Sequence, residues 1–238
     1  MQGSGTPVPK DIGLYNAEPK PMSEVELDET RGQLSINAEI VLYGGSASRS
    51  LAIEVAADIQ YQWNQPGASV RVNGKWYLVA FKITGTHMPE LTKYDVYENT
   101  DPKKNYFRVE DYASGNISFV DGLNSNTGYF KLDNLVNNST TAAHEFGHTI
   151  GLDHPDNLDI RGFGVPGIMY PRGTITDPEF QYDPLAEPLQ PGGTMNPFHR
   201  KVLLSDIGDL YLPNLSYNGQ GKAILGDFTS IWHDAHAT

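Results

Sequence analysis

Hydrophobic residues in the first third of the chain follow two different spacings. From residue 34 to residue 42 every second side chain is apolar, which predicts a strand with one buried face. Between residues 51 and 63 apolar side chains recur every four residues. This spacing predicts an amphipathic helix, with Ser46 or Ser48 as its N-cap and the Pro-Gly pair at 66–67 after its end.

The next hundred residues predict short strands. Residues 70–83 hold an Asn-Gly pair between two apolar stretches, which is typical of a β-hairpin with a tight turn. Further short strands are expected at 106–110, 116–120 and 128–132. The predicted order therefore begins strand, helix, strand, strand, as an α+β fold would.

The two ends and the last third of the chain predict little regular structure. Residues 1–31 are rich in Pro, Glu and Lys without periodicity, which indicates a flexible tail or linker. Residues 171–197 are rich in Pro and Gly and are expected to be mostly loop, and 198–211 are expected to form the last helix. Residues 214–238 look irregular, so their two histidines are expected to lie in a frayed tail rather than to bind a metal.

The stretch most informative about chemistry is 144–154, which reads H-E-x-x-H-x-x-G-x-x-H. On a helix, residues four apart lie about 40° apart around the axis, so His144 and His148 share one face. Two imidazoles so placed can bind one Zn²⁺ at ~2.0–2.1 Å each. Glu145 follows the first histidine, and its carboxylate can point toward a water on the metal. A core helix with merely hydrogen-bonded histidines would not require this spacing.

The third histidine of the motif requires the helix to end. In a continuous helix the ten residues from His144 to His154 would span ~15 Å, too far to share one ion. Gly151 precedes His154, and glycine readily adopts the left-handed conformation that ends a helix and reverses the chain. The motif therefore predicts a break at Gly151 that returns His154 to the metal.

This motif resembles that of the metzincin zinc peptidases. Within that group, the sequence of residues 144–154 is most similar to the matrixins, the matrix-metalloproteinase-like branch. Residues 167–171, Gly-Ile-Met-Tyr-Pro, resemble the matrixin Met-turn, and residues 204–211 resemble the start of the matrixin C-terminal helix. The resemblance is strong over 144–171 and weaker over 198–211.

The resemblance implies a metzincin-like α+β fold, with a twisted mixed sheet and two main helices in an upper lobe, an active-site cleft, and a smaller irregular lower lobe ending in a helix. The peptidase domain would be residues 32–238, divided into an upper lobe at about 32–151 and a lower lobe at about 152–238. Met169 would lie beneath the zinc as a hydrophobic floor. A strand at the rim of the cleft would pair with extended substrate through Asn116, Ile117, Ser118, Phe119 and Val120.

The implied activity is that of a zinc-dependent endopeptidase. His144, His148 and His154 would hold one catalytic Zn²⁺, and a water would complete a tetrahedral site. The metal would lower the pKa of this water toward ~7 and polarise the scissile carbonyl. Glu145 would take the proton of the water and pass it to the leaving amine.

Two other interpretations remain open. The domain could be a non-catalytic zinc-holding recognition module, although a pure binding module has no need of a base such as Glu145. It could also be a peptidase toxin or effector domain of a larger bacterial protein. Residues 1–10 lack a hydrophobic signal core, so either a signal has been removed or the chain is a piece of a longer protein. The resemblance implies a secreted or extracellular enzyme.

Composition narrows the range of partners and ligands. A net charge of −12 and a pI near 4.9 argue against nucleic acid or an anionic membrane as a partner. The resemblance implies a protein or peptide substrate, and we expect a monomer. No run of 18 apolar residues exists that could span a membrane. The absence of cysteine excludes disulfides and a cysteine-based latency within this chain.

The loop 121–126 offers oxygen ligands for Ca²⁺, but its spacing fits no defined calcium loop, and we expect an ordinary polar turn.

Overall fold

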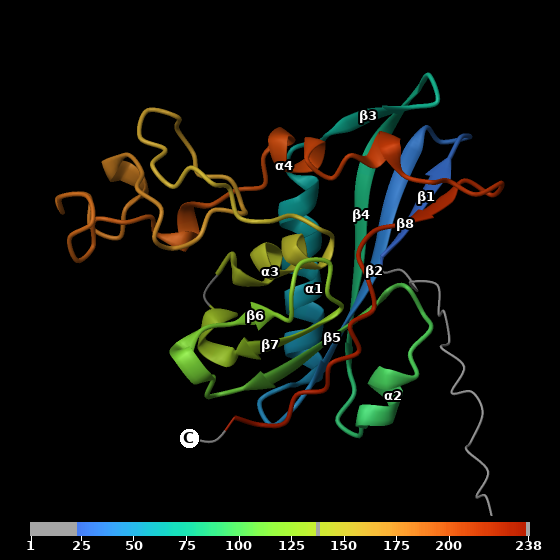
Figure 1. The fold of residues 1–238 in the computed structure, drawn as a ribbon, viewed down its shortest axis with the longest axis horizontal. Helices are drawn as coiled ribbons and strands as arrows, with labels where there is room; N and C mark the ends of the chain where they lie inside the picture. Colours follow the sequence, from blue (N-terminus) through green and yellow to red (C-terminus); the bar gives the residue numbers. More distant parts are fainter. Residues whose placement is uncertain (1–22, 137–138, 237–238) are drawn as a thin grey trace, which may run out of the picture.

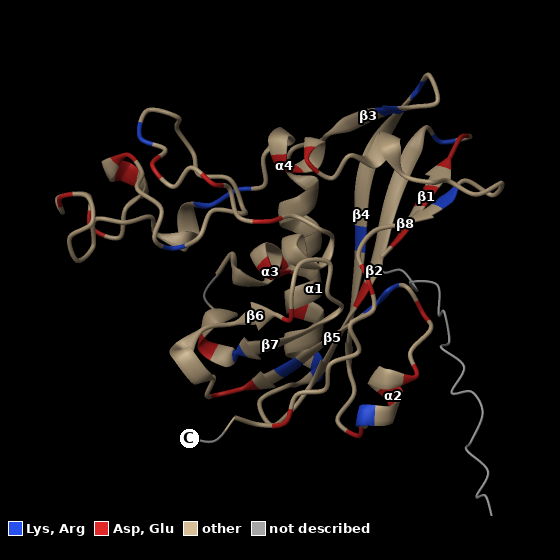
Figure 2. Ribbon diagram, viewed as in Figure 1, with Lys and Arg blue, Asp and Glu red and all other residues tan. Residues whose placement is uncertain are grey.

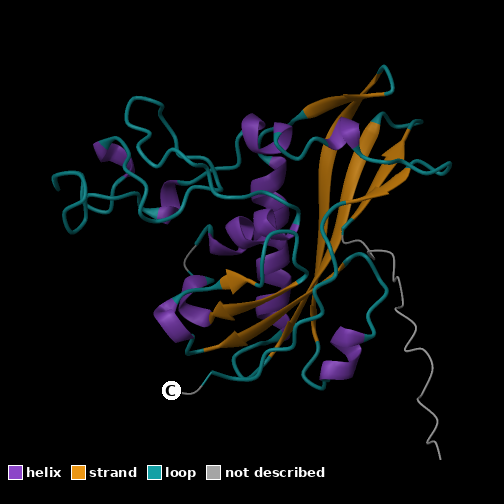
Figure 3. Ribbon diagram, viewed as in Figure 1, coloured by secondary structure: helices purple, strands orange, loops and turns teal. Residues whose placement is uncertain are grey.

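An eight-stranded, curled sheet with mixed strand directions organises the fold (Figure 1). The computed structural model describes residues 23–136 and 139–236. Figure 3 shows helices gathered mainly on one side of the sheet and long loops extending beyond them. The strands are β1 (Glu24–Asp28), β2 (Gln33–Tyr43), β3 (Ser69–Val72), β4 (Lys75–His87), β5 (Lys104–Glu110), β6 (Phe119–Val120), β7 (Thr127–Lys131) and β8 (Lys222–Ile224).

Strand β2 is the central strand of the sheet. One edge of β2 pairs in parallel with β4, while the other edge pairs with antiparallel β1 over its first half and with parallel β5 over its second half. The main path of the sheet runs β3-β4-β2-β5-β7-β6. Strand β6 pairs antiparallel with β7 and ends this path.

Helix α1 (Arg49–Asn64) covers the inner face of the sheet, and helix α3 (Thr141–Thr149) packs against α1 (Figure 1). The Nε1–H of Trp63 on α1 donates a 3.0 Å hydrogen bond to the carbonyl oxygen of Ala143 on α3. This bond is buried and fixes α3 against α1. The helices are α1 (Arg49–Asn64), α2 (Lys93–Tyr97), α3 (Thr141–Thr149) and α4 (Leu204–Gly208), and the 3-10 turns are η1 (Ser114–Asn116), η2 (Leu132–Asn134), η3 (Pro178–Phe180), η4 (Pro197–His199) and η5 (Leu212–Asn214).

The first half of the fold follows the predicted pattern closely. The Oγ of Ser48 accepts a 3.1 Å hydrogen bond from the backbone N–H of Leu51, so Ser48 is the N-cap of α1. The turn between β3 and β4 has φ of +48° at Asn73 and +84° at Gly74, the backbone that two-residue hairpins need. The α+β class and these elements are therefore confirmed.

The predicted tail at 1–31 is wrong for its last part. Residues 1–22 lie outside the described residues, but β1 pairs with β2 on one side and with β8, two hundred residues away, on the other. Val25 on β1 is fully buried. Charged residues alternate with apolar ones along β1, and the strand depends on these non-local partners, so local composition alone suggested a linker.

The predicted helix at 198–211 is also wrong over most of its length. Only α4, at Leu204–Gly208, is α-helical within it. Residue Lys201 instead forms an isolated parallel bridge with Gly167, and Tyr211 has a left-handed φ of +47°. The prolines of η4 and η5 also favour short turns at the two ends.

The C-terminal segment packs against the sheet instead of fraying (Figure 1). The Trp232 ring stacks on Tyr43 at a centroid distance of 4.8 Å. Both side chains belong to a small hydrophobic cluster that also contains Val96 of α2. The Nε2 of His233 lies 2.8 Å from a carboxylate oxygen of Asp121, and the His236 ring stacks on Tyr129 at 4.1 Å. The expectation that these histidines lie in a frayed tail is therefore wrong.

Charge is dispersed over the molecule, with acidic and basic residues on strands and loops alike (Figure 2). In the described ranges, no helix is long and apolar enough to cross a bilayer.

Candidate metal centre

Helix α3 holds the first two histidines of the motif rigidly. Almost all of its residues are buried, and Phe146 packs edge-on against Trp63 at a centroid distance of 6.0 Å. The sequence favoured Asn137, Asn138 or Ser139 as its cap. The first two lie outside the described residues, whereas the Oγ of Ser139 accepts a 3.2 Å hydrogen bond from the backbone N–H of Thr141. The formal N-cap is the next residue, Thr140.

The chain turns sharply after α3. Gly151 has φ of +99°, and the backbone N–H of Leu152 donates a 2.9 Å hydrogen bond to the carbonyl of Gly147. Such a left-handed residue with a backward hydrogen bond is how many helices end. The turn brings His154 back, so that its Nε2 lies 3.1 Å from the Nε2 of both His144 and His148.

Backbone carbonyls fix the orientation of two of the rings. The Nδ1 of His144 lies 2.7 Å from the carbonyl oxygen of Ile168, and the Nδ1 of His148 lies 2.7 Å from that of Leu152. Because a carbonyl can only accept, each neutral ring carries its proton on Nδ1 and presents a lone pair on Nε2. Both rings thereby have the tautomer that a metal ligand needs.

The three Nε2 atoms face one another, which is unfavourable unless a cation lies between them. Zn–N bonds of ~2.0–2.1 Å in a tetrahedral site imply ligand separations of roughly 3.3 Å, close to the 3.1 Å observed. Within 23–136 and 139–236, these three histidines are the one group of His, Cys, Asp or Glu that converges in this way. The triad could therefore hold a metal ion, and its donors are compatible with zinc.

Burial keeps the triad neutral. It lowers the pKa of His144 well below its ordinary value, with smaller contributions from the charge of Arg200 and from His148. Burial also lowers the pKa of His148 and of the more exposed His154. Neutral imidazoles are the form that binds metal, so the site is ready to ligate at neutral pH.

Glu145 lies in the same cavity and is only 7% exposed. Burial raises the pKa of Glu145 to about 8, although the charges of Arg200 and Arg172 and a hydrogen bond from the backbone of Val120 act in the opposite direction. Among the described residues, no basic side chain forms an ion pair with Glu145 within 4.0 Å. The carboxylate is thus a buried group with a high proton affinity beside the triad.

Met169 lies on the other side of α3, in the core. It is 3% exposed, and its sulfur occupies the space where a Cβ would project from Gly147. The preceding residue, Ile168, supplies the carbonyl that orients His144. The segment 167–171 thus both packs beneath the helix and orients one histidine.

A cavity of about 430 Å³ opens in front of the triad. The predicted strand at 116–120 is shortened here to Phe119–Val120, because Asn116 has φ of +58° and the Oγ of Ser118 accepts the backbone N–H of Lys131 in place of a ladder carbonyl. Asn116 does not line the cavity. Its lining residues are Ile117, Ser118, Phe119, Val120, Thr141, His144, Glu145, His148, His154, Pro171, Arg172 and Arg200.

Sequence reasoning missed the two arginines of this cavity. Arg200 lies in the segment expected to be a helix, where an Arg normally faces solvent, yet it is 5% exposed. Arg172 follows the Met-turn-like segment and lies at the start of a predicted loop. No spacing in the sequence connects either arginine with the motif.

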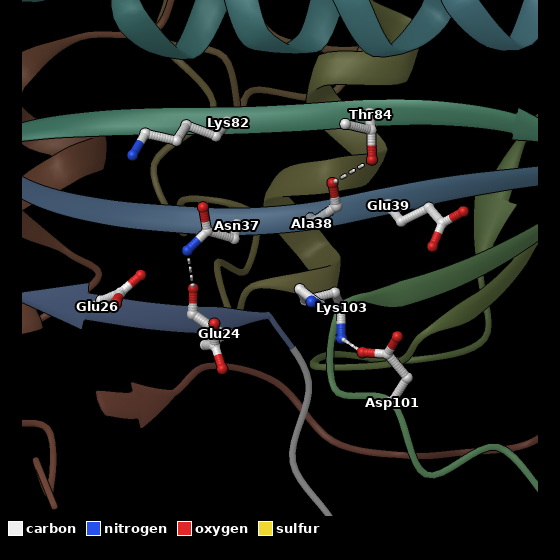
Figure 4. A pocket seen from close by; sticks show the side chains of 9 residues that line it. All are labelled: Glu24, Glu26, Asn37, Ala38, Glu39, Lys82, Thr84, Asp101 and Lys103. Atoms are coloured by element: carbon white, nitrogen blue, oxygen red, sulfur yellow. Dashed lines mark hydrogen bonds between the residues drawn. The ribbon is translucent and has the colours of Figure 1, made fainter. Parts of the chain in front are cut away.

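A second hollow, of about 370 Å³, lies on the outer face of the sheet (Figure 4). It is lined by four carboxylates and two amines, and Figure 4 shows these side chains spread along the strands rather than converging. Glu39 accepts a 2.6 Å hydrogen bond from the hydroxyl of Thr86, and Glu24 pairs with Lys222 at 2.9 Å. This outer hollow has the composition of a solvated surface.

A comparison of the chain with protein-family models gives no match, and neither does a comparison with curated proteins.

Proposed function

We propose that this protein is a zinc-dependent endopeptidase of the metzincin type, most similar to the matrixin branch. The observation that carries the proposal is that the Nε2 of His154 lies 3.1 Å from the Nε2 of both His144 and His148, beside a buried Glu145 in one cavity. Two carbonyls pre-set the ligand tautomers. A pure recognition module would gain nothing from a buried carboxylate at this place.

Each residue has a role in this proposal. His144, His148 and His154 hold the zinc ion, which when bound supplies a Lewis acid for polarising a carbonyl and acidifying water. Glu145 takes a proton from the attacking water and delivers it to the leaving amine. Arg200 and Arg172 oppose the effect of burial on Glu145, and so favour the ionised form that can accept that proton.

The edge of the sheet offers a place for an extended substrate. Strand β6 ends the sheet path, and Phe119 and Val120 line the cavity that contains Glu145. A peptide added at this edge would gain main-chain hydrogen bonds without requiring a particular sequence. The substrate class is therefore protein or peptide in extended conformation.

Hydrolysis of a peptide library tests the proposal. We expect the zinc-loaded protein to cleave internal bonds, to lose activity with a chelator and to regain it with added Zn²⁺. If protein shown to contain zinc cleaves no peptide of a broad library, the result contradicts the peptidase assignment and favours a recognition module.

A further inference from the structure

The cavity of the proposed site has a cationic wall. Of its lining residues Glu145 is the one carboxylate, whereas Arg172 and Arg200 contribute two guanidinium groups. This local balance is opposite in sign to the net charge of −12 of the whole chain. The cavity is therefore electrostatically unlike the rest of the molecule.

Arg200 is held rigidly in that wall. Its Nε donates a 2.9 Å hydrogen bond to the hydroxyl of Thr140, and its Nη1 donates a 2.9 Å hydrogen bond to the carbonyl of Tyr170. The hydroxyl of Thr140 in turn donates to the carbonyl of Pro197 at 2.7 Å. Two neutral acceptors thus position the guanidinium without neutralising it.

The charge of Arg200 interacts with that of Glu145 across the cavity, but it forms no close ion pair with any carboxylate in the described part of the chain. No ion pair within 4.0 Å involves Arg200 there, and its Nη2 has no hydrogen-bond acceptor among the same residues. Burial of a cation without its counter-charge is costly. A carboxylate that entered the cavity would form a charge-assisted pair with a guanidinium that is already oriented.

We propose that Arg200, with Arg172 at its side, makes the enzyme selective for a carboxylate close to the scissile bond. The inference depends on the proposed peptidase function and specifies its substrate class. The carboxylate could belong to an Asp or Glu side chain within the substrate, or to a free C-terminus just beyond the cleaved bond. Arg200 is a specificity-determining residue, because it meets the substrate but moves no proton.

Pairs of quenched fluorogenic peptides distinguish these two sources. One series is amidated at its C-terminus and carries Glu or isosteric Gln at each of the positions on either side of the bond. The other series ends one or two residues beyond the bond, with a free or an amidated terminus. We expect a preference of about tenfold or more in kcat/KM for the carboxylate at one position in one series.

Substitution of the arginine supplies the decisive comparison. Arg200→Gln keeps an N–H donor for Thr140 but removes the charge and the donor to Tyr170, and should reduce the Glu-over-Gln ratio to near one. Arg172→Gln should reduce it partially, and this residue is exposed, so its substitution does not endanger the fold. Arg49→Gln, at an exposed position on α1, is the matched control and should leave the ratio unchanged. Zinc content and thermal unfolding establish that each variant is folded.

A binding assay separates this inference from the peptidase assignment. Zinc-loaded Glu145→Gln protein should bind the Glu peptide about tenfold more tightly than the Gln peptide, as measured by fluorescence anisotropy. The double variant, which carries Glu145→Gln and Arg200→Gln, should bind the two peptides equally. If the Glu peptide binds more tightly than the Gln peptide but the wild type cleaves neither, the peptidase assignment is wrong and the role of Arg200 in carboxylate recognition stands. Equal rates and equal binding for all carboxylate and amide pairs, or a preference that survives Arg200→Gln, would overturn the role of Arg200.

Discussion

The two hollows of this protein have similar volumes but opposite chemistry. The inner cavity of about 430 Å³ contains buried histidines, Glu145 and Arg200, none of which is ion-paired within the described residues. The outer hollow of about 370 Å³ contains more charges, but Glu24 and Glu39 already have partners there. Burial raises the pKa of Glu145 and lowers those of the three histidines in the inner cavity.

The difference shows what distinguishes a chemical site from a charged surface. In the inner cavity, hydrogen bonds from the Nδ1–H groups of His144 and His148 to neutral backbone carbonyls orient the two rings while leaving their Nε2 atoms free. In the outer hollow, Lys222 pairs with Glu24, and the hydroxyl of Thr86 donates a hydrogen bond to Glu39. Functional groups need orientation without neutralisation, and that condition is met on one side of the sheet. The following experiments test this contrast.

The largest effect is expected for Glu145→Ala. General acid-base catalysis contributes typically 10²–10⁴-fold, and here one group serves both proton transfers, so peptide hydrolysis should fall by at least about that factor. Zinc content should stay near that of the wild type, because no ligand is removed. Glu39→Gln, in the outer hollow, is the matched control and should cleave normally. Equal cleavage by Glu145→Ala and wild type would disprove the proposed mechanism even if the metal site is correct.

The next largest effect is expected for His154→Ala. It leaves two ligands on α3, so zinc affinity should fall by more than about 100-fold, beyond the range typical of losing an outer-shell partner. Competition with a chromophoric chelator measures this affinity. His87→Ala, at the end of β4, should keep one zinc per chain. An unchanged affinity in His154→Ala would remove that histidine from the site.

Much of this contrast could be predicted from the sequence, but only where the information is local. The spacing of the motif brought His144, His148 and His154 together, and Gly151 marked the turn between them. Alternation and caps located β2, α1 and the hairpin that follows. These features depend on residues within one element or one turn of each other.

The missed features depend on distant partners. Strand β1 needs β2 and β8, and Trp232 is ordered by Tyr43 near the other end of the chain. Arg200 belongs to the cavity because Thr140 and Tyr170 accept its hydrogen bonds. The alternation of charged and apolar residues along β1 was a strand signal within a segment of linker-like composition, whereas the contacts of Trp232 and Arg200 leave no periodicity in the sequence.

A third effect concerns the stability of the metal-free protein. Burial raises the pKa of Glu145 to about 8, so the folded state keeps a proton that the unfolded state loses near pH 4.3. Stability is therefore lost as pH rises from about 4.3 through 8. Glu145→Gln carries no such titration and should become more stable relative to wild type by roughly 3–4 kcal/mol between pH 5 and pH 8, since each pH unit within this window is worth about 1.36 kcal/mol.

Urea unfolding in the presence of a chelator measures this difference. Glu39→Gln, in the outer hollow, is measured in parallel as the matched control. A constant difference between Glu145→Gln and wild type over this pH range would mean that the carboxylate of Glu145 is better solvated than its burial indicates.

The smallest effect is expected for Gly147→Ala, which tests how tightly the inner cavity is supported from behind. An added Cβ would overlap the sulfur of Met169 and lie 3.3 Å from the ring of Trp63. Both neighbours are buried, so the methionine must move within a packed core, and such overpacking typically costs about 1–3 kcal/mol. Because Ile168 beside Met169 orients His144, zinc affinity should also fall modestly.

Gly173→Ala is the matched control, because a Cβ added there would meet no atom within 4 Å and its φ is not left-handed. If Gly147→Ala unfolds at the same urea concentration as Gly173→Ala and binds zinc equally well, the packing of Met169 beneath α3 does not support the metal site.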